Sequence, residues 1–265
     1  MSNVGWATKS TIDLLLKDGA VKIDPSNERI CSSLISSALE YTNNLPNPEK
    51  IQCGWGEYNK GDKVGDDAIQ SLLTDYIASG IHTLFDNSRW PRHWAGAQIA
   101  YQFPRDGRIA RKVGFHVDGY PDPEEGKPKM FNPLSLLIGI LLHPVCEDGG
   151  AFCYVPGSHT EVAQRFEKQT GETRRDRLKT VGDDWDRRSS STAAIGDAGT
   201  IFILDPLTIH GTRENETAKR RTMVFFRIRQ SKPWEVDLDS SLIGQTRPGW
   251  NGLSAILAQD ASPTS

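Results

Sequence analysis

Short apolar or alternating runs, separated by Gly, Pro and Asp, dominate the sequence after Trp90. The runs are Ala97–Phe103, Lys112–Val117, Ser135–His143, Ala151–Val155, Thr200–Leu204, Thr208–Thr212 and Thr222–Ile228. Many short strands bounded by turn residues favour a β-sandwich or a β-barrel. A doubly wound parallel sheet would need long helices between the strands, and this region has no pattern for them. The sequence therefore predicts a mainly β core.

The N-terminal region instead shows helical periodicity. Ser10–Lys17 is an apolar-periodic stretch that Gly19 should end, because glycine tolerates the left-handed conformation found after helices. Ala20–Ile23 then alternates like a strand. Asp24 followed by Pro25 resembles an N-cap and a first-turn proline, so we expect a second helix to begin there.

Three further stretches complete the pattern. Residues 44–65 are rich in Asn, Pro and Gly and are expected to form mainly a loop. A third helix should start at Asp66 or Asp67 and end near Gly80. From Trp234 onward the periodicity is weak, which indicates an extended tail.

We expect residues 1–265 to form one domain. Its parts would be a helical support at 1–95, a β core at 96–230 with a charged insertion at 160–192, and a C-terminal tail at 231–265.

Charge and hydropathy exclude several classes of partner. The 31 Lys and Arg residues against 34 Asp and Glu give a formal net charge of -3. Nucleic-acid binders and binders of anionic membranes carry a basic excess, so we expect neither partner. The longest apolar run, Leu136–Leu142, is far shorter than the roughly 20 residues that span a bilayer. The first residues do not resemble a signal peptide, and the cysteines form no CxxC motif, so we expect a cytoplasmic protein with reduced thiols.

The sharpest chemical signal is the segment GFHVDG at 114–119. His116 and Asp118 are two positions apart, so on a strand their side chains share a face and can bind one metal ion. For this pair alone, a surface His–Asp hydrogen bond is the simpler interpretation. His210, in a later strand run, is a third candidate, and two histidines with one carboxylate form the facial triad of non-haem Fe(II) oxygenases. Zinc is the competing metal, but it cannot change its redox state.

A facial triad leaves three positions open on an octahedral ion, enough for a bidentate 2-oxo acid and O₂. The far carboxylate of a 2-oxo diacid needs a positive partner. Arg221, just before Thr222–Ile228, is suited because its planar fork can hold a carboxylate with two hydrogen bonds. Thr212 shares the face of His210, so its hydroxyl can donate to the same group. Arg220 lies on the opposite face, so the choice between the two arginines depends on the strand register. The alternative interpretation is that Arg220 and Arg221 form a basic pair on the surface and bind no ligand.

The order of these motifs resembles the phytanoyl-CoA dioxygenase family. The matching segments are HVDG at 116–119, EDGG at 147–150, VPGSH at 155–159, HGT at 210–212 and Arg221. The resemblance spans roughly residues 97–229, and the helix–Gly19–strand pattern near the N-terminus also suits the family.

The resemblance implies a double-stranded β-helix, a cupin-like jelly roll, with N-terminal helices packed against it. It implies that His116, Asp118 and His210 ligate Fe(II) and form the catalytic centre, while Arg221 and Thr212 bind 2-oxoglutarate. The expected reaction uses O₂ to oxidise, most simply to hydroxylate, an unactivated carbon of a small organic substrate. It is coupled to decarboxylation of 2-oxoglutarate to succinate and CO₂. Related halogenases have a small residue in place of the aspartate, so Asp118 disfavours halogenation.

Other polar residues near these motifs have weaker signals. Gln98 and Tyr101 lie on the strand before HVDG, and Gln98 is a candidate contact for 2-oxoglutarate. Tyr120, in the turn-rich segment after the ligands, is a candidate substrate contact. His143 and His159 are expected to be structural polar residues rather than ligands.

Two alternatives to hydroxylation stay open. The same iron site could perform desaturation, ring formation or epimerisation in specialised metabolism. A jelly-roll module that binds a metal or ligand without turnover belongs to another class, although such a module does not need Arg221. The sequence predicts a small-molecule partner and leaves the oligomeric state open.

Overall fold

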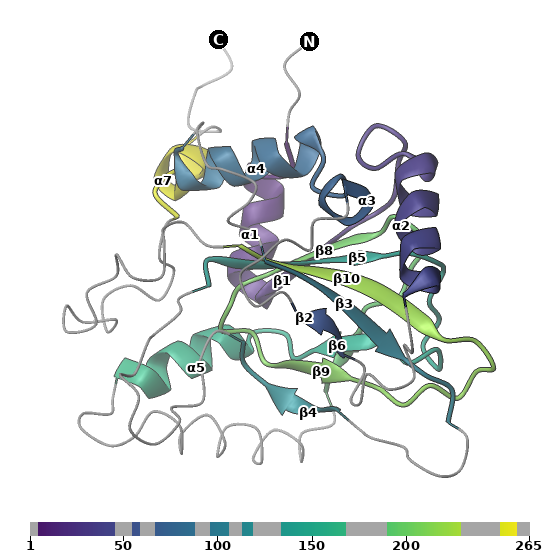
Figure 1. Ribbon diagram of the computed structural model, residues 1–265. Coiled ribbons are helices and arrows are strands. Elements are labelled where there is room, and N and C mark those ends of the chain that lie inside the picture. The colour runs from purple at the N-terminus through teal and green to yellow at the C-terminus, as the bar shows by residue number, and fades with distance from the viewer. Residues whose placement is uncertain are drawn as a thin grey trace, which may run out of the picture.

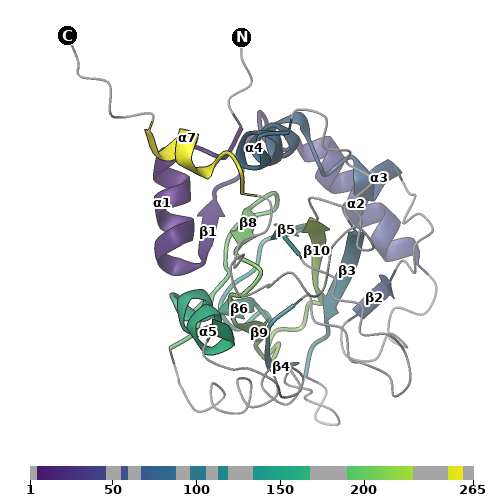
Figure 2. The same cartoon turned by 90° about the vertical axis from the view of Figure 1, so that its left-hand side faces the viewer.

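The computed structural model describes residues 5–45, 55–58, 67–87, 96–105, 113–118, 134–167, 190–228 and 250–258. In this part of the chain, two antiparallel sheets lie one above the other. Helices cover the face of the larger sheet that is turned away from the smaller one (Figure 1). The same layers are visible in the perpendicular view of Figure 2.

The larger sheet contains six strands in the order β1-β8-β5-β10-β3-β2, all antiparallel to their neighbours. They are β1 (Ala20–Ile23), β8 (Ile201–Leu204), β5 (Leu136–Leu141), β10 (Arg221–Ile228), β3 (Gly96–Gln102) and β2 (Trp55–Tyr58). The smaller sheet has the order β4-β9-β6-β7. Its strands are β4 (Val113–His116), β9 (His210–Thr212), β6 (Phe152–Tyr154) and β7 (Thr192–Ala193).

The strand pairing confirms the predicted mainly β, jelly-roll class of fold. Each of the seven strand runs seen in the sequence corresponds to an observed strand. Two strands, β2 and β7, were not predicted from the sequence. β2 lies within the expected loop at 44–65, and β7 lies at the end of the insertion at 160–192.

The helices are α1 (Lys9–Asp18), α2 (Ser32–Asn44), α3 (Asp67–Gln70), α4 (Asp75–Phe85), α5 (Ser158–Glu167) and α7 (Leu253–Leu257). α5 lies beside the smaller sheet, away from the other helices (Figure 1). α7 contacts α1 and α4, so the expected extended C-terminal tail contains a short helix. None of the helices in the described ranges has both the length and the apolar character to cross a bilayer.

The expected start of the second helix at Asp24 and Pro25 is wrong, because α2 begins only at Ser32. One local and one tertiary contact hold the intervening segment in turns. The guanidinium of Arg29 donates to the carbonyl of Asp24, and Thr74 Oγ1 donates to the carbonyl of Arg29 over 2.7 Å.

The third expected helix is interrupted, because α3 ends at Gln70 and α4 begins at Asp75. The expected end at Gly80 is also wrong, since α4 continues to Phe85. Gly80 permits a close approach instead: a Cβ there would lie 2.3 Å from ring atoms of Trp6.

Side-chain alternation along β10 separates two apolar layers. Val224 and Phe226 pack in the layer between the larger sheet and the helices, whereas Phe225 packs in the layer between the two sheets. Because strand residues alternate, Arg221 and Arg227 point to the same side as Phe225. Buried cations need polar or anionic partners. The two arginines therefore indicate a binding site in the layer between the two sheets.

Candidate metal centre and its pocket

Strand pairing brings three residues from distant parts of the sequence to one point. His116 ends β4, and Asp118 follows two residues later. His210 begins β9, the neighbour of β4, and is the direct cross-strand partner of His116. One donor atom from each of these three residues lies within 4.8 Å of the other two. The structure therefore brings the three predicted metal ligands together.

The side-chain orientations suit a metal ion. Nε2 of His116 lies 3.6 Å from Oδ1 of Asp118, and Nε2 of His210 lies 3.9 Å from Oδ2. Nδ1 of His116 faces the carbonyl of Gly114 at 3.1 Å, and Nδ1 of His210 faces that of Thr208 at 2.9 Å. A carbonyl only accepts hydrogen bonds, so in each neutral ring Nδ1 carries the proton and Nε2 carries the lone pair.

The charge states also suit a metal ion. Burial lowers the pKa of His210 to about 4, and the neighbouring His116 acts in the same direction. The imidazole of His210 is therefore neutral near pH 7, the form that binds metals. Burial acts to raise the pKa of Asp118, but the combined charges of His210, Arg227 and His116 lower it. The site thus presents two imidazoles and a carboxylate, which fit Fe(II) by number and type.

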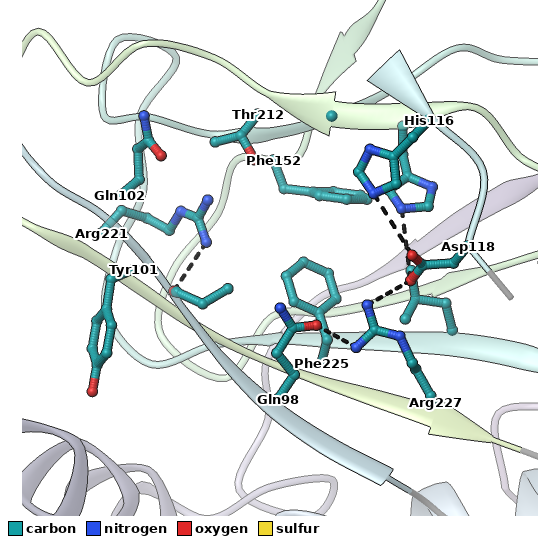
Figure 3. Close-up of a pocket in the computed structure, with 14 residues that line it drawn as sticks. Gln98, Tyr101, Gln102, His116, Asp118, Phe152, Thr212, Arg221, Phe225 and Arg227 are labelled. Atoms are coloured by element: carbon teal, nitrogen blue, oxygen red, sulfur yellow. Dashed lines mark hydrogen bonds and ion pairs between the residues drawn. The ribbon is translucent and has the colours of Figure 1, made fainter. Parts of the chain in front are cut away.

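Arg227 was not anticipated from the sequence. Its Nη2 lies 2.8 Å from Oδ2 of Asp118, and its Nη1 donates to Oε1 of Gln98 (Figure 3). A signal was present, because Arg227 lies an even number of positions after Arg221 on one apolar strand run. An even spacing on a strand puts both side chains on the same face.

Arg221 and the His–Asp–His cluster line one pocket, and the guanidinium of Arg221 is turned into it (Figure 3). Its Nε donates to the carbonyl of Gly150 over 3.0 Å, and its Nη1 donates to that of Ala100 over 3.2 Å. Burial lowers the pKa of Arg221 to about 10, so the side chain is still charged near pH 7. Arg220 points away, stacks over the ring of Tyr101 and donates to Asn43. The register of β10 thus places Arg221, and not Arg220, in the pocket.

The pocket joins Arg221 to the His–Asp–His cluster. It contains about 440 Å³ of empty space, part of it open to solvent. Phe152 packs against both His210 and Phe225, with ring centroids 5.3 and 5.0 Å apart, and forms an aromatic wall. Gln98 and Thr212 also line the pocket. Phe152, Phe225 and Gln102 are lining residues that the sequence analysis did not single out.

The remaining polar residues predicted from the sequence make structural contacts, and among them Tyr101 also lines the pocket. Tyr101 turns its ring toward the helices, and its hydroxyl donates to the carbonyl of Thr42. Nε2 of His159 faces the carbonyl of Leu16 at 3.0 Å, and Nε2 of His143 accepts from the backbone N–H of Thr222. Both histidines therefore have structural contacts, as expected. The candidate substrate contact Tyr120 lies outside the described residues.

Solved structures with the same fold include three similar proteins. HygX from Streptomyces hygroscopicus, solved with nickel, 2-oxoglutarate and hygromycin B, is 15% identical; the match covers 83% of this chain and 86% of that chain, with a TM-score of 0.55. EctD from S. alaskensis, solved with 2-oxoglutarate and 5-hydroxyectoine, is 15% identical over 89% of this chain and 82% of that chain, with a TM-score of 0.57. SnoK is a non-haem α-ketoglutarate-dependent carbocyclase from nogalamycin biosynthesis. It is 20% identical; the match covers 83% of this chain and 82% of that chain, with a TM-score of 0.53.

No curated protein sequence shows significant similarity to the chain. The model of the phytanoyl-CoA dioxygenase (PhyH) family, in contrast, matches residues 18–223. This range includes His116, Asp118, His210 and Arg221. The chain therefore belongs to the phytanoyl-CoA dioxygenase family of 2-oxoglutarate-dependent non-haem iron dioxygenases.

Proposed function

We propose that this dioxygenase hydroxylates an unactivated carbon of a small organic substrate and converts 2-oxoglutarate and O₂ to succinate and CO₂. The observation that carries this proposal is the meeting of His116, Asp118 and His210 at one end of a pocket that also contains Arg221. Fe(II), when bound there, would supply the redox chemistry that activates O₂.

The three clustered side chains would hold the metal. His116 and His210 would bind through Nε2, because the carbonyls of Gly114 and Thr208 hold each Nδ1–H and orient each ring. Asp118 would supply the anionic ligand. Its presence supports hydroxylation over halogenation, because a carboxylate occupies the position that a halide would need.

Arg221 would bind the far carboxylate of 2-oxoglutarate. Its guanidinium is fixed by the carbonyls of Gly150 and Ala100, so a carboxylate need not order a flexible side chain on binding. Thr212 lines the same pocket and would donate its hydroxyl to that carboxylate. For Gln98 a contact with 2-oxoglutarate stays a prediction, since its Oε1 accepts from Arg227.

The walls of the pocket would position the substrate and exclude water. Phe152 and Phe225 present apolar surface beside the His–Asp–His cluster, which favours an aliphatic or aromatic carbon at the reacting position.

A cytoplasmic location is part of the proposal and is supported by the free thiols of Cys31, Cys146 and Cys153.

Anaerobic titration provides the first test. The chain loaded with Fe(II) should develop a weak visible charge-transfer band when 2-oxoglutarate is added. With O₂ and a suitable substrate, it should release succinate and a product heavier by one oxygen atom. A product lighter by two hydrogens, or of unchanged mass, would instead indicate desaturation or epimerisation. Absence of the band with one Fe(II) bound per chain would contradict 2-oxoglutarate binding at this site.

A further inference from the structure

Arg227 links the carboxylate of Asp118 to the neighbouring strand. Nη2 of Arg227 lies 2.8 Å from Oδ2 of Asp118, and Nη1 donates to Oε1 of Gln98 on β3. The side chains of Arg227 and Asp118 are only 10% and 11% exposed. The family model ends at residue 223, so Arg227 lies beyond the part of the chain that the family match covers.

The two oxygens of Asp118 have different surroundings. Oδ1 lies 3.6 Å from Nε2 of His116. Oδ2 lies 3.9 Å from Nε2 of His210 but only 2.8 Å from the guanidinium of Arg227. A metal ion approaching Oδ2 would therefore have to compete with a cation that already contacts this oxygen.

The number of oxygens that Asp118 supplies decides how many positions stay open on the metal. A carboxylate can bind a metal through one oxygen or through both. With one oxygen, two imidazoles and the carboxylate leave three positions of an octahedral ion free, as a 2-oxo acid and O₂ require. With both oxygens only two positions remain, and a chelating 2-oxo acid would fill them.

We infer that Arg227 is a positioning residue. Its ion pair keeps Oδ2 of Asp118 away from the metal and so restricts this carboxylate to one metal-binding oxygen. Gln98 accepts a hydrogen bond from the other arm of the guanidinium and so holds the charge of Arg227 beside Oδ2. The inference rests on the proposed function, because it requires a metal at His116, Asp118 and His210. It assigns Arg227 to the control of coordination number rather than to binding of 2-oxoglutarate.

The test counts the water molecules on a bound metal and needs no turnover. Mn(II) is added to the full-length protein without 2-oxoglutarate, and water-proton relaxation gives the number of exchanging waters per bound ion. The unaltered chain should hold three waters. Arg227→Met, which keeps an unbranched side chain but removes the cation, should hold two, because Oδ2 becomes free to bind the metal. If this variant does not fold, Arg227→Gln replaces it with the same expected result.

Two further variants separate positioning from a general loss of charge or structure. Arg227→Lys restores a cation that can reach Oδ2 and should return the count to three. Arg105→Met removes an arginine from a comparable 2.9 Å ion pair, with Glu214, that does not line the pocket, and it should leave the count at three. The dissociation constant for Mn(II) in Arg227→Met should stay within about threefold of that of the unaltered chain or become tighter, since a nearby positive charge has been removed.

Three waters on Mn(II) in the folded Arg227→Met protein would overturn the inference. So would a loss of Mn(II) affinity of about tenfold or more, roughly 1.4 kcal/mol, because Arg227 would then support the site as a whole. Failure of the unaltered chain to bind Mn(II) at this site would contradict the proposed function itself. Normal Mn(II) and 2-oxoglutarate binding, with an unchanged water count in Arg227→Met, would contradict only the role of Arg227.

Discussion

His116 and His210 face each other across the β4–β9 pair, with ring centroids 4.5 Å apart and both Nε2 atoms near the carboxylate of Asp118. The backbone pairing of these strands, and not the proximity of the residues in sequence, creates the cluster.

Replacing either histidine by alanine should remove the metal. His116→Ala and His210→Ala each leave two of the three donors, so we expect the stoichiometry of Fe(II) to fall from one per chain to near zero and succinate formation to disappear. Metal analysis after gel filtration measures the first effect, and a succinate assay measures the second. Iron retained at full stoichiometry in the double variant would contradict the assignment of the ligands.

His159→Ala should affect folding and not metal binding. His159 is buried, and its Nε2 faces the carbonyl of Leu16, so its loss should lower the free energy of unfolding by about 1–3 kcal/mol. Thermal unfolding checks this change, and Fe(II) stoichiometry at low temperature should stay at one per chain. Loss of iron from the folded variant would show that His159 belongs to the metal site.

Arg221→Gln should weaken 2-oxoglutarate binding while leaving Fe(II) bound. The substitution removes the buried cation proposed to pair with the far carboxylate, at a cost of about 2–5 kcal/mol, or roughly 30-fold or more in KM for 2-oxoglutarate. Arg220→Gln is the matched control, because Arg220 stacks over Tyr101 on the other side of the strand. Equal effects of the two substitutions on KM would contradict the choice of Arg221.

Gly19→Ala should destabilise the protein. Gly19 has φ 74°, and a Cβ there would lie 2.5 Å from Nδ1 of His159 and from Oγ1 of Thr208. The left-handed conformation costs a non-glycine residue about 1–2 kcal/mol, and the clash adds to this cost. A denaturant titration should therefore show a clear fall in the free energy of unfolding.

Gly114→Ala is the control for that measurement, because a Cβ at Gly114 would have no heavy atom within 4 Å. Its free energy of unfolding should change by no more than about 0.5 kcal/mol. Similar losses in the two variants would mean that the contacts around Gly19 do not explain its requirement for glycine.

The sequence alone was sufficient to place most strands and the candidate metal ligands. Strands appear as short apolar runs between turn residues, because burial and pleating act locally on neighbouring side chains. The two-residue spacing of His116 and Asp118 likewise predicts a shared face wherever the backbone is extended. Arg221 was predicted to bind the far carboxylate of 2-oxoglutarate from its chemistry and its position at the start of a strand run, and this role stays a prediction.

Tertiary structure decided what local patterns leave open. Asp24 and Pro25 form a good local start for a helix, yet the segment forms turns, and Thr74, which is distant in the sequence, donates to the carbonyl of Arg29 there. The even spacing from Arg221 gives the face on which Arg227 lies, but not the residues that it contacts. Only the packing of β10 against β3, and of the smaller sheet above them, places it between Asp118 and Gln98. Such pairings depend on strand register and sheet stacking, and these are properties of the whole chain rather than of its short segments.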